Sequence, residues 1–233
     1  MTRKQLSNLP LIEDVFTFWD VLTPDERNFI STHYSVHQYN KNETIQCEGD
    51  DPTHLMVLAS GKVKVYKSGL ANRTQIVRML KPGENFGYRA IIANEKNNTT
   101  VTAFENSIVY TIKADIFLSI LRHNNAFCYR FLEELASDLA DSDSRTVNLT
   151  QKHIRGRLAE SLLFLKDNYG LEADGATLSI YLSREDLANH SNMTTSNAIR
   201  TLANFVSENL ISIDGRKIKI LDEERLRKIS KLG

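Results

Sequence analysis

The stretch that most constrains this chain is residues 183–220, SREDLANHSNMTTSNAIRTLANFVSENLISIDGRKIKI. Ser183 lies three residues before Asp186, a spacing typical of a side chain that caps a helix N-terminus. Asn192 falls at a corner, and Asn tolerates a left-handed backbone better than most residues. Thr194 is placed to cap the next helix. The pattern therefore predicts two short helices joined by a tight corner.

The second of these helices has an apolar and a polar face. Ala198, Leu202 and the pair Phe205 and Val206 recur at spacings of three and four, which predicts a buried stripe. The polar face consists of short side chains and one arginine, which can reach base edges and phosphates.

A β-hairpin is expected directly after these helices. Asp214 and Gly215 lie between the apolar runs ISI and KIKI and predict a two-residue turn. Helix, corner, helix and hairpin in this order predict a winged helix-turn-helix, which places its second helix in a DNA major groove. An ordinary helical hairpin beside a β-hairpin is the alternative. The side chains expected to contact double-stranded DNA are Ser183, Thr194, Thr195, Ser196, Asn197, Arg200, Arg216 and Lys217.

Net charge does not indicate a partner, because Lys+Arg and Asp+Glu both number 29. Residues 1–150 carry a net charge of −2 and residues 151–233 one of +2, which has the sign expected of a C-terminal DNA-binding part but is small. No run has the length of a membrane span and no signal-peptide pattern opens the chain. We expect a cytoplasmic protein without a membrane partner.

The pattern of apolar and polar residues changes twice along the chain. Residues 1–35 predict a helical lead-in, with a helix that starts at Thr23 and Pro24 and ends near His33. Residues 36–112 contain short alternating runs broken by turns, which predicts a sandwich or jelly-roll. Beyond them we expect helices over 114–121, 125–149 and 151–169, a strand over 178–182, and a last helix over 223–231 after Asp222.

These elements predict an α+β protein of three parts. The parts are an N-terminal β-roll (1–123), a long dimerisation helix (124–150) and a C-terminal winged helix-turn-helix (151–233). The long helix carries residues at alternating steps of three and four, a heptad-like seam that predicts a two-fold homodimer. A helix packed only on its own β-roll is the alternative. The predicted seam is Leu132, Leu135, Leu139, Ser142, Thr146 and Leu149.

Three segments resemble a known family. The strand pattern LMVLASGKVKV at 55–65, the turn LKPGENFG at 80–87, and Arg157, Leu158 and Ala159 ahead of the helix-turn-helix are similar to the bacterial Crp/Fnr transcription regulators. The resemblance covers about residues 15–221. It implies a cyclic-nucleotide-binding-like β-roll, a homodimer, a near-palindromic operator, transcription activation with RNA polymerase as a partner, and no enzymatic activity.

The departures from this family concern the effector. Members that bind cyclic AMP place Glu after the Phe-Gly pair and an Arg-Ser pair further on, whereas this chain has Tyr88 and the run Asn98-Thr99-Thr100. With neither the carboxylate nor the guanidinium of that pattern, we expect no cyclic AMP response. The family-equivalent pocket for an unidentified small-molecule effector is Gly87, Tyr88, Arg89, Ala90, Ile91, Thr99, Thr100 and Val101.

No cofactor is evident in the sequence. Cys47 and Cys128 are too few to hold an iron–sulfur cluster, and residues 1–46 contain no cysteine, unlike the oxygen-sensing branch of the family. Scattered histidines indicate no metal site, although haem sensing in the family leaves haem as an alternative. A ligand-independent regulator and a cupin-type metal enzyme are the alternative functions, and the enzyme would need a second histidine near His54.

The predicted recognition helix also departs from the family. Ser196 stands where many members have Glu, whereas the Arg four residues later is present as Arg200. A Glu accepts a hydrogen bond from cytosine and an Arg binds guanine or phosphate. We therefore expect an operator different from the common half-sites of the family.

Overall fold

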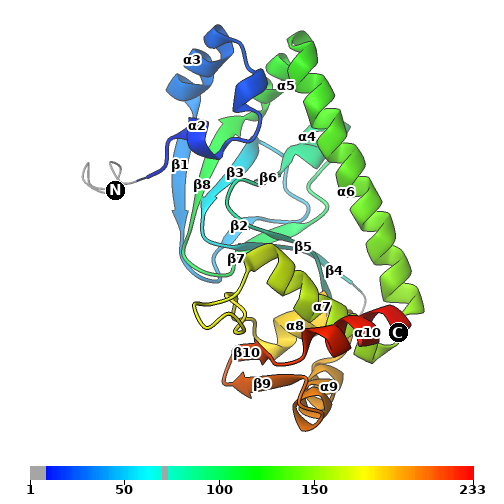
Figure 1. The fold of residues 1–233 in the computed structure, drawn as a ribbon. Helices are drawn as coiled ribbons and strands as arrows, with labels where there is room; N and C mark the ends of the chain where they lie inside the picture. The colour runs from blue at the N-terminus through cyan, green and yellow to red at the C-terminus, as the bar shows by residue number, and fades with distance from the viewer. Residues whose placement is uncertain (1–8, 70–72) are drawn as a thin grey trace. The chain divides into compact units, whose positions relative to one another are not determined.

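The structure is a computed structural model that describes residues 9–69 and 73–233 (Figure 1). The predicted lead-in begins in residues 1–8, which lie outside the described residues. The chain forms two compact units, one comprising Met1–Ser68 and Val77–Asp138 and the other Gly69–Ile76 and Leu139–Gly233. The long helix α6 (Asn125–Gln151) belongs to both units, because it continues past the boundary at Asp138.

The lead-in contains α2 (Ile12–Val15), a 3-10 turn η1 (Trp19–Val21) and α3 (Pro24–His33). The predicted start of α3 is confirmed. The Thr23 hydroxyl accepts a hydrogen bond from the Glu26 amide at 3.3 Å, and the Glu26 carboxylate accepts one from the Thr23 amide at 2.8 Å. This reciprocal pair satisfies two amides that an uncapped helix would leave unbonded.

Two four-stranded antiparallel sheets form the predicted β-roll, in the strand orders β1-β8-β3-β6 and β2-β7-β4-β5. The short helix α4 follows β6 at the turn that begins with Leu80. The elements are β1 (Ser35–Tyr39), β2 (Thr44–Gln46), β3 (His54–Ser60), β4 (Val63–Ser68), β5 (Thr74–Leu80), β6 (Asn85–Phe86), α4 (Tyr88–Ala93), β7 (Thr100–Ala103) and β8 (Ser107–Lys113).

The β-roll has two hydrophobic clusters. One is built from strand residues that include Leu58, Val63, Phe86 and Val109. The other joins strand β3 to the N-terminal helices, to α5 (Ala114–His123) and to the first half of α6. Its aromatic centre is the contact of Phe16, Phe18, Phe117, Phe127 and Phe131, whose ring centroids lie 5.1–6.3 Å apart.

The second unit contains the predicted winged helix-turn-helix. Its elements are α7 (Ile154–Tyr169), α8 (Arg184–His190), α9 (Thr195–Ser207), β9 (Ile211–Asp214), β10 (Lys217–Ile220) and α10 (Glu223–Leu232). Asp222 caps α10, because its carboxylate accepts a hydrogen bond from the Arg225 amide at 2.9 Å. The long helices begin or end two or three residues away from the predicted bounds.

The predicted strand over 178–182 is wrong. Only single bridges form there, Leu171 with Leu178 and Thr177 with Lys219. The Leu178 amide donates to the Ile218 carbonyl at 2.9 Å, while the Ser179 amide donates to the Gly170 carbonyl at 3.2 Å. The backbone therefore bonds to two different segments and forms no continuous ladder, although Leu178, Ile180 and Leu182 are buried as their alternation implies.

The aromatic centre predicts a stability measurement. Replacing Phe131 with Ala removes a side chain that is 1% exposed, and we expect the free energy of unfolding to fall by about 3–5 kcal/mol. Urea unfolding followed by circular dichroism measures this loss. Leu11→Ala, at a position that is 57% exposed, is the control and should change the midpoint little. Equal midpoints for the two variants would contradict the assignment of Phe131 to the core.

Candidate DNA interface and effector pocket

The helix-turn-helix is closed by the caps that the sequence predicts. The Ser183 hydroxyl accepts a hydrogen bond from the Asp186 amide at 2.9 Å and donates to the Asp186 carboxylate at 2.7 Å. Thr194 caps α9 by accepting a hydrogen bond from the Asn197 amide at 3.2 Å. Asn192 lies at the corner with φ of +50°, in the left-handed region. Because Ser183 uses its hydroxyl within the motif, it serves the cap and is only half-exposed.

Helix α9 separates a buried from an exposed face. Ala198, Leu202 and Phe205 are buried as predicted, but Val206 is 39% exposed, so its assignment to the buried stripe is wrong. Thr201, which was not predicted to be buried, belongs to the buried stripe instead and is 2% exposed. The helical period explains the difference, because residue 201 follows 198 by three positions and 206 falls outside the row. Between residues 195 and 204, the exposed side chains are Thr195, Ser196, Ile199, Arg200, Ala203 and Asn204.

Asn197 lies half-buried beside this exposed face. Its side-chain oxygen accepts a hydrogen bond from the Arg200 guanidinium at 2.6 Å. This contact holds Arg200 along the helix surface while leaving it exposed. Asn197 therefore orients the arginine rather than projecting freely.

Ile199 is a candidate that the sequence analysis missed. Its side chain is 51% exposed and follows Ser196 by three positions, on the same face as Arg200. The DNA contacts predicted on that face are all polar, although an apolar side chain can contact the methyl group of thymine. The signal in the sequence was the apolar Ile199 between the polar residues Ser196 and Arg200 on one face of the helix.

The wing hairpin has its turn one residue later than predicted. Asp214 pairs with Lys217, so the two loop residues are Gly215 and Arg216. Gly215 has φ of +56° at the first turn position, and two-residue hairpin turns with a positive φ at this position favour glycine. The Arg184 guanidinium donates to the Gly215 carbonyl at 2.8 Å and so ties the wing to α8.

The two predicted basic residues of the wing differ in their surroundings. Arg216 is exposed at the tip of the hairpin. Lys217 is exposed too, but its ammonium lies 3.4 Å from the Glu172 carboxylate and 5.4 Å from the centre of the Tyr181 ring. Arg216 is therefore the better candidate for a phosphate contact.

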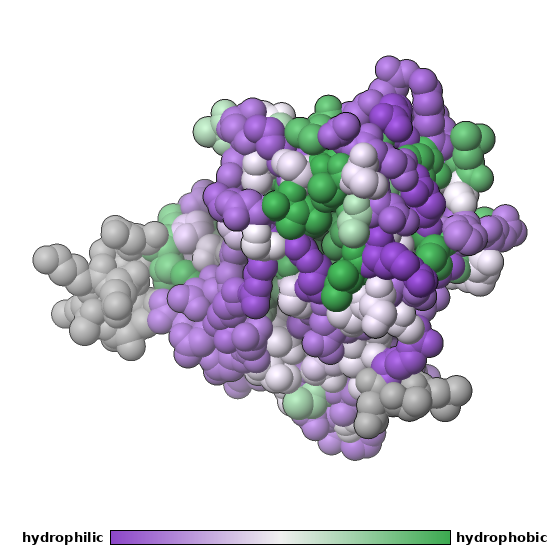
Figure 2. Space-filling view, turned by 90° about the horizontal axis from the view of Figure 1, so that it is seen from below, coloured by the Kyte–Doolittle hydropathy of each residue, from purple (hydrophilic) through white to green (hydrophobic). Residues whose placement is uncertain are grey.

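Figure 2 shows hydrophobic side chains gathered in a patch among hydrophilic ones on the side of the molecule that it views.

Arg157 on α7 joins the end of α6 to the helix-turn-helix corner. Its guanidinium donates to the carbonyls of Lys152 at 3.0 Å, Ser191 at 3.1 Å and Asn192 at 3.1 Å. Carbonyls at helix ends and corners lack intrahelical partners, so one planar guanidinium satisfies several of them at once. The recognition helix is thereby coupled to the segment between α6 and α7.

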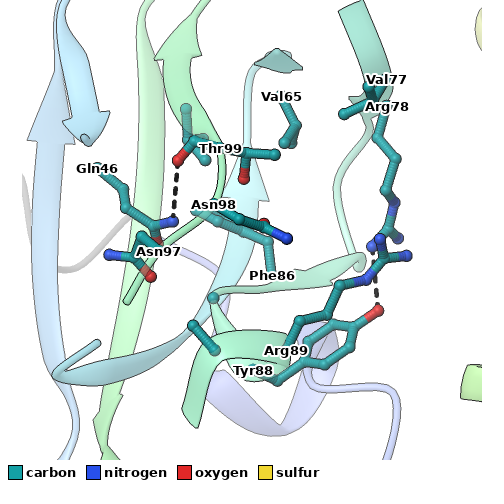
Figure 3. A pocket seen from close by; sticks show the side chains of 13 residues that line it. Gln46, Val65, Val77, Arg78, Phe86, Tyr88, Arg89, Asn97, Asn98 and Thr99 are labelled. Atoms are coloured by element: carbon teal, nitrogen blue, oxygen red, sulfur yellow. Dashed lines mark hydrogen bonds between the residues drawn. The ribbon is translucent and has the colours of Figure 1, made fainter. Parts of the chain in front are cut away.

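The β-roll contains a pocket that the sequence analysis located in part (Figure 3). Of the predicted residues, Gly87, Tyr88, Arg89, Ala90, Thr99 and Val101 line it. Ile91 does not, because it is buried in the aromatic cluster. Thr100 does not either, and its hydroxyl instead accepts a hydrogen bond from the Glu48 amide at 3.1 Å. Residues that line the pocket without having been predicted are Gln46, Val65, Val77, Arg78, Phe86, Asn97 and Asn98.

A cluster of charged groups borders the pocket. The Tyr88 hydroxyl donates to the Asp138 carboxylate of α6 and accepts a hydrogen bond from the Arg78 guanidinium at 3.0 Å. The same Asp138 oxygen lies 3.2 Å from a guanidinium nitrogen of Arg78 and 3.0 Å from one of Arg89. We call Arg78, Tyr88, Arg89 and Asp138 the Asp138 cluster.

Electrostatics in the Asp138 cluster favour an ionised carboxylate beside a neutral tyrosine. Burial alone acts to raise the pKa of Asp138, but Arg78, Tyr88 and Arg89 outweigh it and hold that pKa below its ordinary value. Burial raises the pKa of Tyr88, so its hydroxyl keeps its proton. Burial together with the charge of Asp138 raises the pKa of the neighbouring Glu134.

The pocket therefore contains guanidinium groups, although the run Asn98-Thr99-Thr100 lacks the arginine of the family pattern. Arg78 comes from strand β5 and Arg89 from helix α4, and neither lies in the loop where the family pattern places its arginine. Only the tertiary structure brings these side chains together. The missing carboxylate is a different matter, because no Asp or Glu is among the described residues that line the pocket.

The exposed stripe of α6 differs from the predicted seam. Leu132 and Leu139 are 56% and 63% exposed, and Ser142 and Thr146 are also exposed. Leu135 packs against the aromatic cluster, and Leu149 is half-buried. The apolar stripe that faces solvent instead consists of Tyr129, Leu132, Ala136, Leu139 and Val147.

Among the described residues, no three His, Cys, Asp or Glu side chains gather in a way that could hold a metal ion. Cys47 is exposed and Cys128 half-exposed, and both are free thiols. No helix in the part of the chain that the structure describes has the length and apolar character of a membrane span.

Two family models match the chain in order. The model of the cyclic nucleotide-binding domain matches residues 36–124, and that of the Crp-like helix-turn-helix domain matches residues 156–229. The first match covers the β-roll and its pocket, and the second covers α8, α9 and the wing. Together they match the order of domains predicted from the sequence.

Individual relatives are distant but span most of the chain. A CRP-like cAMP-activated global transcriptional regulator of Mycobacterium tuberculosis is 23% identical over 189 residues, which is 81% of this chain and 84% of that protein. The structure resembles a Crp/Fnr-family protein from Eubacterium rectale (TM-score 0.79, 22% identity, 94% of this chain and 100% of that one). It also resembles FixK2 from Bradyrhizobium japonicum (TM-score 0.76, 19% identity, 84% and 96%). At these identities the solved structures show the fold alone.

A buried histidine makes the C-terminal unit sensitive to acid. His190 at the end of α8 is 5% exposed, its Nδ1 lies 3.0 Å from the Ser161 hydroxyl, and its ring packs on Phe164. Burial, and secondarily the positive charge of Arg145, lowers its pKa to about 3. The unfolded chain therefore binds a proton below the ordinary histidine pKa of about 6.5, whereas the folded chain binds it only near 3.

We expect the unfolding free energy to fall as the pH drops below about 6.5, by about 2 kcal/mol between pH 7.5 and pH 5. Urea unfolding at the two pH values measures this loss. His190→Asn should remove that part of the pH dependence, whereas His123→Asn, at an exposed position, should keep it. An unchanged pH dependence in His190→Asn would contradict the assignment.

Proposed function

Because this chain is a transcription regulator of the Crp/Fnr family with a helix-turn-helix DNA-binding domain, we propose that it reads a near-palindromic operator as a homodimer and that a small molecule in the β-roll sets its affinity for DNA. The observation that carries this proposal is the exposed face of α9. That face combines hydroxyl groups, the apolar side chain of Ile199 and one arginine on a helix that Thr194 caps at its N-terminus.

Each side chain on that face has a chemical role in the proposal. Thr195 and Ser196 donate or accept hydrogen bonds at base edges, and Ile199 contacts a thymine methyl group. Arg200, held by Asn197, binds guanine or a phosphate. Arg216 at the wing tip contacts a neighbouring phosphate. Ser196 in place of the more common Glu gives the chain an operator of its own.

The homodimer is proposed from α6. From Tyr129 to Leu139 its exposed apolar stripe follows steps of three, four and three, which is the spacing that pairs two helices. A second copy of the chain presents the same stripe, so a two-fold contact buries both. Such a dimer places the two recognition helices about 34 Å apart, in successive major grooves.

We assign three functional parts to the chain. Residues 1–123 sense the effector, residues 124–150 pair with a second copy of the chain, and residues 151–233 bind DNA. The hinge lies near residues 148–152, where α6 ends and where Arg157 bonds the Lys152 carbonyl. As an activator, the bound dimer contacts RNA polymerase. The role as an activator and the contact with RNA polymerase are proposed from family membership.

The signal is proposed to differ from cyclic AMP. A ribose is held in that branch by a Glu, and Tyr88 occupies its place here. The second candidate is a ligand-independent regulator, which the Asp138 cluster favours because Asp138 already bonds both pocket arginines. The two candidates differ in whether any small molecule changes the affinity for the operator.

Selection of bound sequences from random DNA with the purified protein tests the proposed function and yields the operator. We expect a site with two-fold symmetry. Recovery of no enriched sequence, or of a site without symmetry, would contradict it. A visible absorption spectrum of the same protein tests the haem alternative.

Arg200→Ala should weaken operator binding by about 1–3 kcal/mol and relax base preference at one position of each half-site. Titrations of the operator and of single-base variants, followed by fluorescence anisotropy, measure both effects. Lys228→Ala on α10 removes a positive charge that is also exposed but lies outside α9, and is the control. Unchanged affinity and base preference in Arg200→Ala would show that it reads no base.

Leu139→Asp should convert the dimer to a monomer at micromolar concentration, because it places a charge in the apolar contact of both copies. Analytical ultracentrifugation measures the mass. Ser137→Asp introduces the same charge on the opposite face of α6 and should leave the dimer intact. A wild-type protein that sediments as a monomer would refute the homodimer itself.

A further inference from the structure

The pocket of the β-roll is polarised along its length. Arg78 and Arg89 lie together at one end, beside the Tyr88 hydroxyl, and the side-chain amides of Gln46, Asn97 and Asn98 lie toward the other (Figure 3). The two arginines are the only charged side chains among the described residues that line it. A ligand that fits this pocket carries negative charge at one end and hydrogen-bonding groups at the other.

An internal anion already bonds the cationic end. Asp138 of α6 is 19% exposed, and one of its oxygens contacts the guanidinium groups of Arg78 and Arg89 and the Tyr88 hydroxyl. Asp138 itself does not line the pocket, so the two guanidinium groups lie between the pocket and α6. Each arginine has further donors, since a guanidinium carries five N–H groups.

Charge and hydrogen bonding both remain incomplete in this region. Arg78 and Arg89 both contact the single carboxylate of Asp138, whereas Glu134 nearby has a raised pKa and favours its neutral form more than an ordinary Glu. At the other end, Asn97 is 5% exposed and its side-chain oxygen has no hydrogen-bond partner among the described residues. A buried carbonyl oxygen without a partner is costly, and a ligand O–H or N–H would satisfy it.

We propose that this pocket binds a small organic anion, a carboxylate or phosphate that also carries an O–H or N–H donor, and that the anion competes with Asp138 for Arg78 and Arg89. The charged group of the ligand takes the guanidinium donors, and its hydroxyl or amine donates to Asn97. The proposal rests on the function proposed above and names the chemical class of its effector.

Competition for the arginines links the pocket to α6. Without the anion, Arg78, Tyr88 and Arg89 attach α6 to the β-roll through Asp138. When the anion takes part of these donors, the attachment at Asp138 weakens while the aromatic contact of Phe127 and Phe131 remains. The signal therefore acts on the half of α6 that follows Asp138, which leads to the DNA-binding domain.

Thermal unfolding of the full-length protein tests the competition, with inorganic phosphate as the first probe and chloride used to keep the ionic strength constant. Each variant is compared with itself in chloride, so differences in basal stability cancel. We expect phosphate to raise the midpoint of the wild type, and Asp138→Asn to bind phosphate about tenfold more tightly because the competing charge is gone. Arg78→Gln should abolish the shift.

Asp141→Asn is the matched control, because it removes a carboxylate from an exposed position on the same helix and outside the Asp138 cluster. It should bind phosphate like the wild type. Equal phosphate affinity in the wild type and Asp138→Asn, or no shift for Asp138→Asn at about 50 mM phosphate, would overturn the proposal. An equal gain in Asp141→Asn would also overturn it, since the effect would then be one of net charge.

Malate and succinate form the second test, because they share two carboxylates and differ by one hydroxyl group. We expect malate to bind more tightly, and Asn97→Leu to remove that advantage without changing the affinity for succinate. No preference for malate in the wild type would overturn the proposed contact with Asn97.

Operator affinity measured in the same samples separates this inference from the proposed function. If Asp138→Asn binds anions more tightly but no sequence is enriched from random DNA, the proposed function fails and the anion site stands. If the operator is bound but its affinity changes with neither phosphate nor malate in Asp138→Asn, the anion-controlled signal fails and DNA binding stands.

Discussion

Phe127 and Phe131 bury one face of α6 in the aromatic cluster of the β-roll, and this contact decides how the rest of that helix is used. A helix is rigid and has 3.6 residues per turn, so burying one face settles where every other side chain points. Tyr129, Leu132 and Leu139 consequently face solvent, and Asp138 faces Tyr88. The exposed apolar stripe and the Asp138 cluster are thus two consequences of one packing interaction.

Polar contacts join α6 to its neighbours on either side of Asp138. In the first unit, the Asp138 carboxylate accepts hydrogen bonds from Tyr88 and Arg89 and forms an ion pair with Arg78. In the second, Arg157 donates to the Lys152 carbonyl and to both carbonyls of the corner that precedes α9. Both depend on geometry that a guanidinium group matches and an ammonium does not, because several donors lie in one plane. Guanidinium groups thus hold α6 at Asp138 within the first unit, and hold the residue that follows α6 within the second.

Local signals in the sequence were the most reliable. Capping at Ser183 and Thr194, the left-handed Asn192 and the start of α3 all follow from contacts within a few residues, and the structure confirms each one. The strand expected over 178–182 failed because alternation reports burial and not pairing, and its backbone bonds to two different segments. Leu135 of the predicted seam of α6 packs against the protein's own core, because a heptad pattern does not say which leucines face that core.

By itself, the sequence determined the winged helix-turn-helix, the β-roll and the face of α9 that is exposed, because each depends on periodicity and caps that short segments carry. The tertiary structure alone decided that Arg78, Arg89 and Asp138 meet at Tyr88. These residues come from β5, α4 and α6, up to 60 positions apart, and no local pattern relates them. Absence of an arginine from one expected loop said little about the charge of the pocket, because a folded chain can supply the same group from another strand.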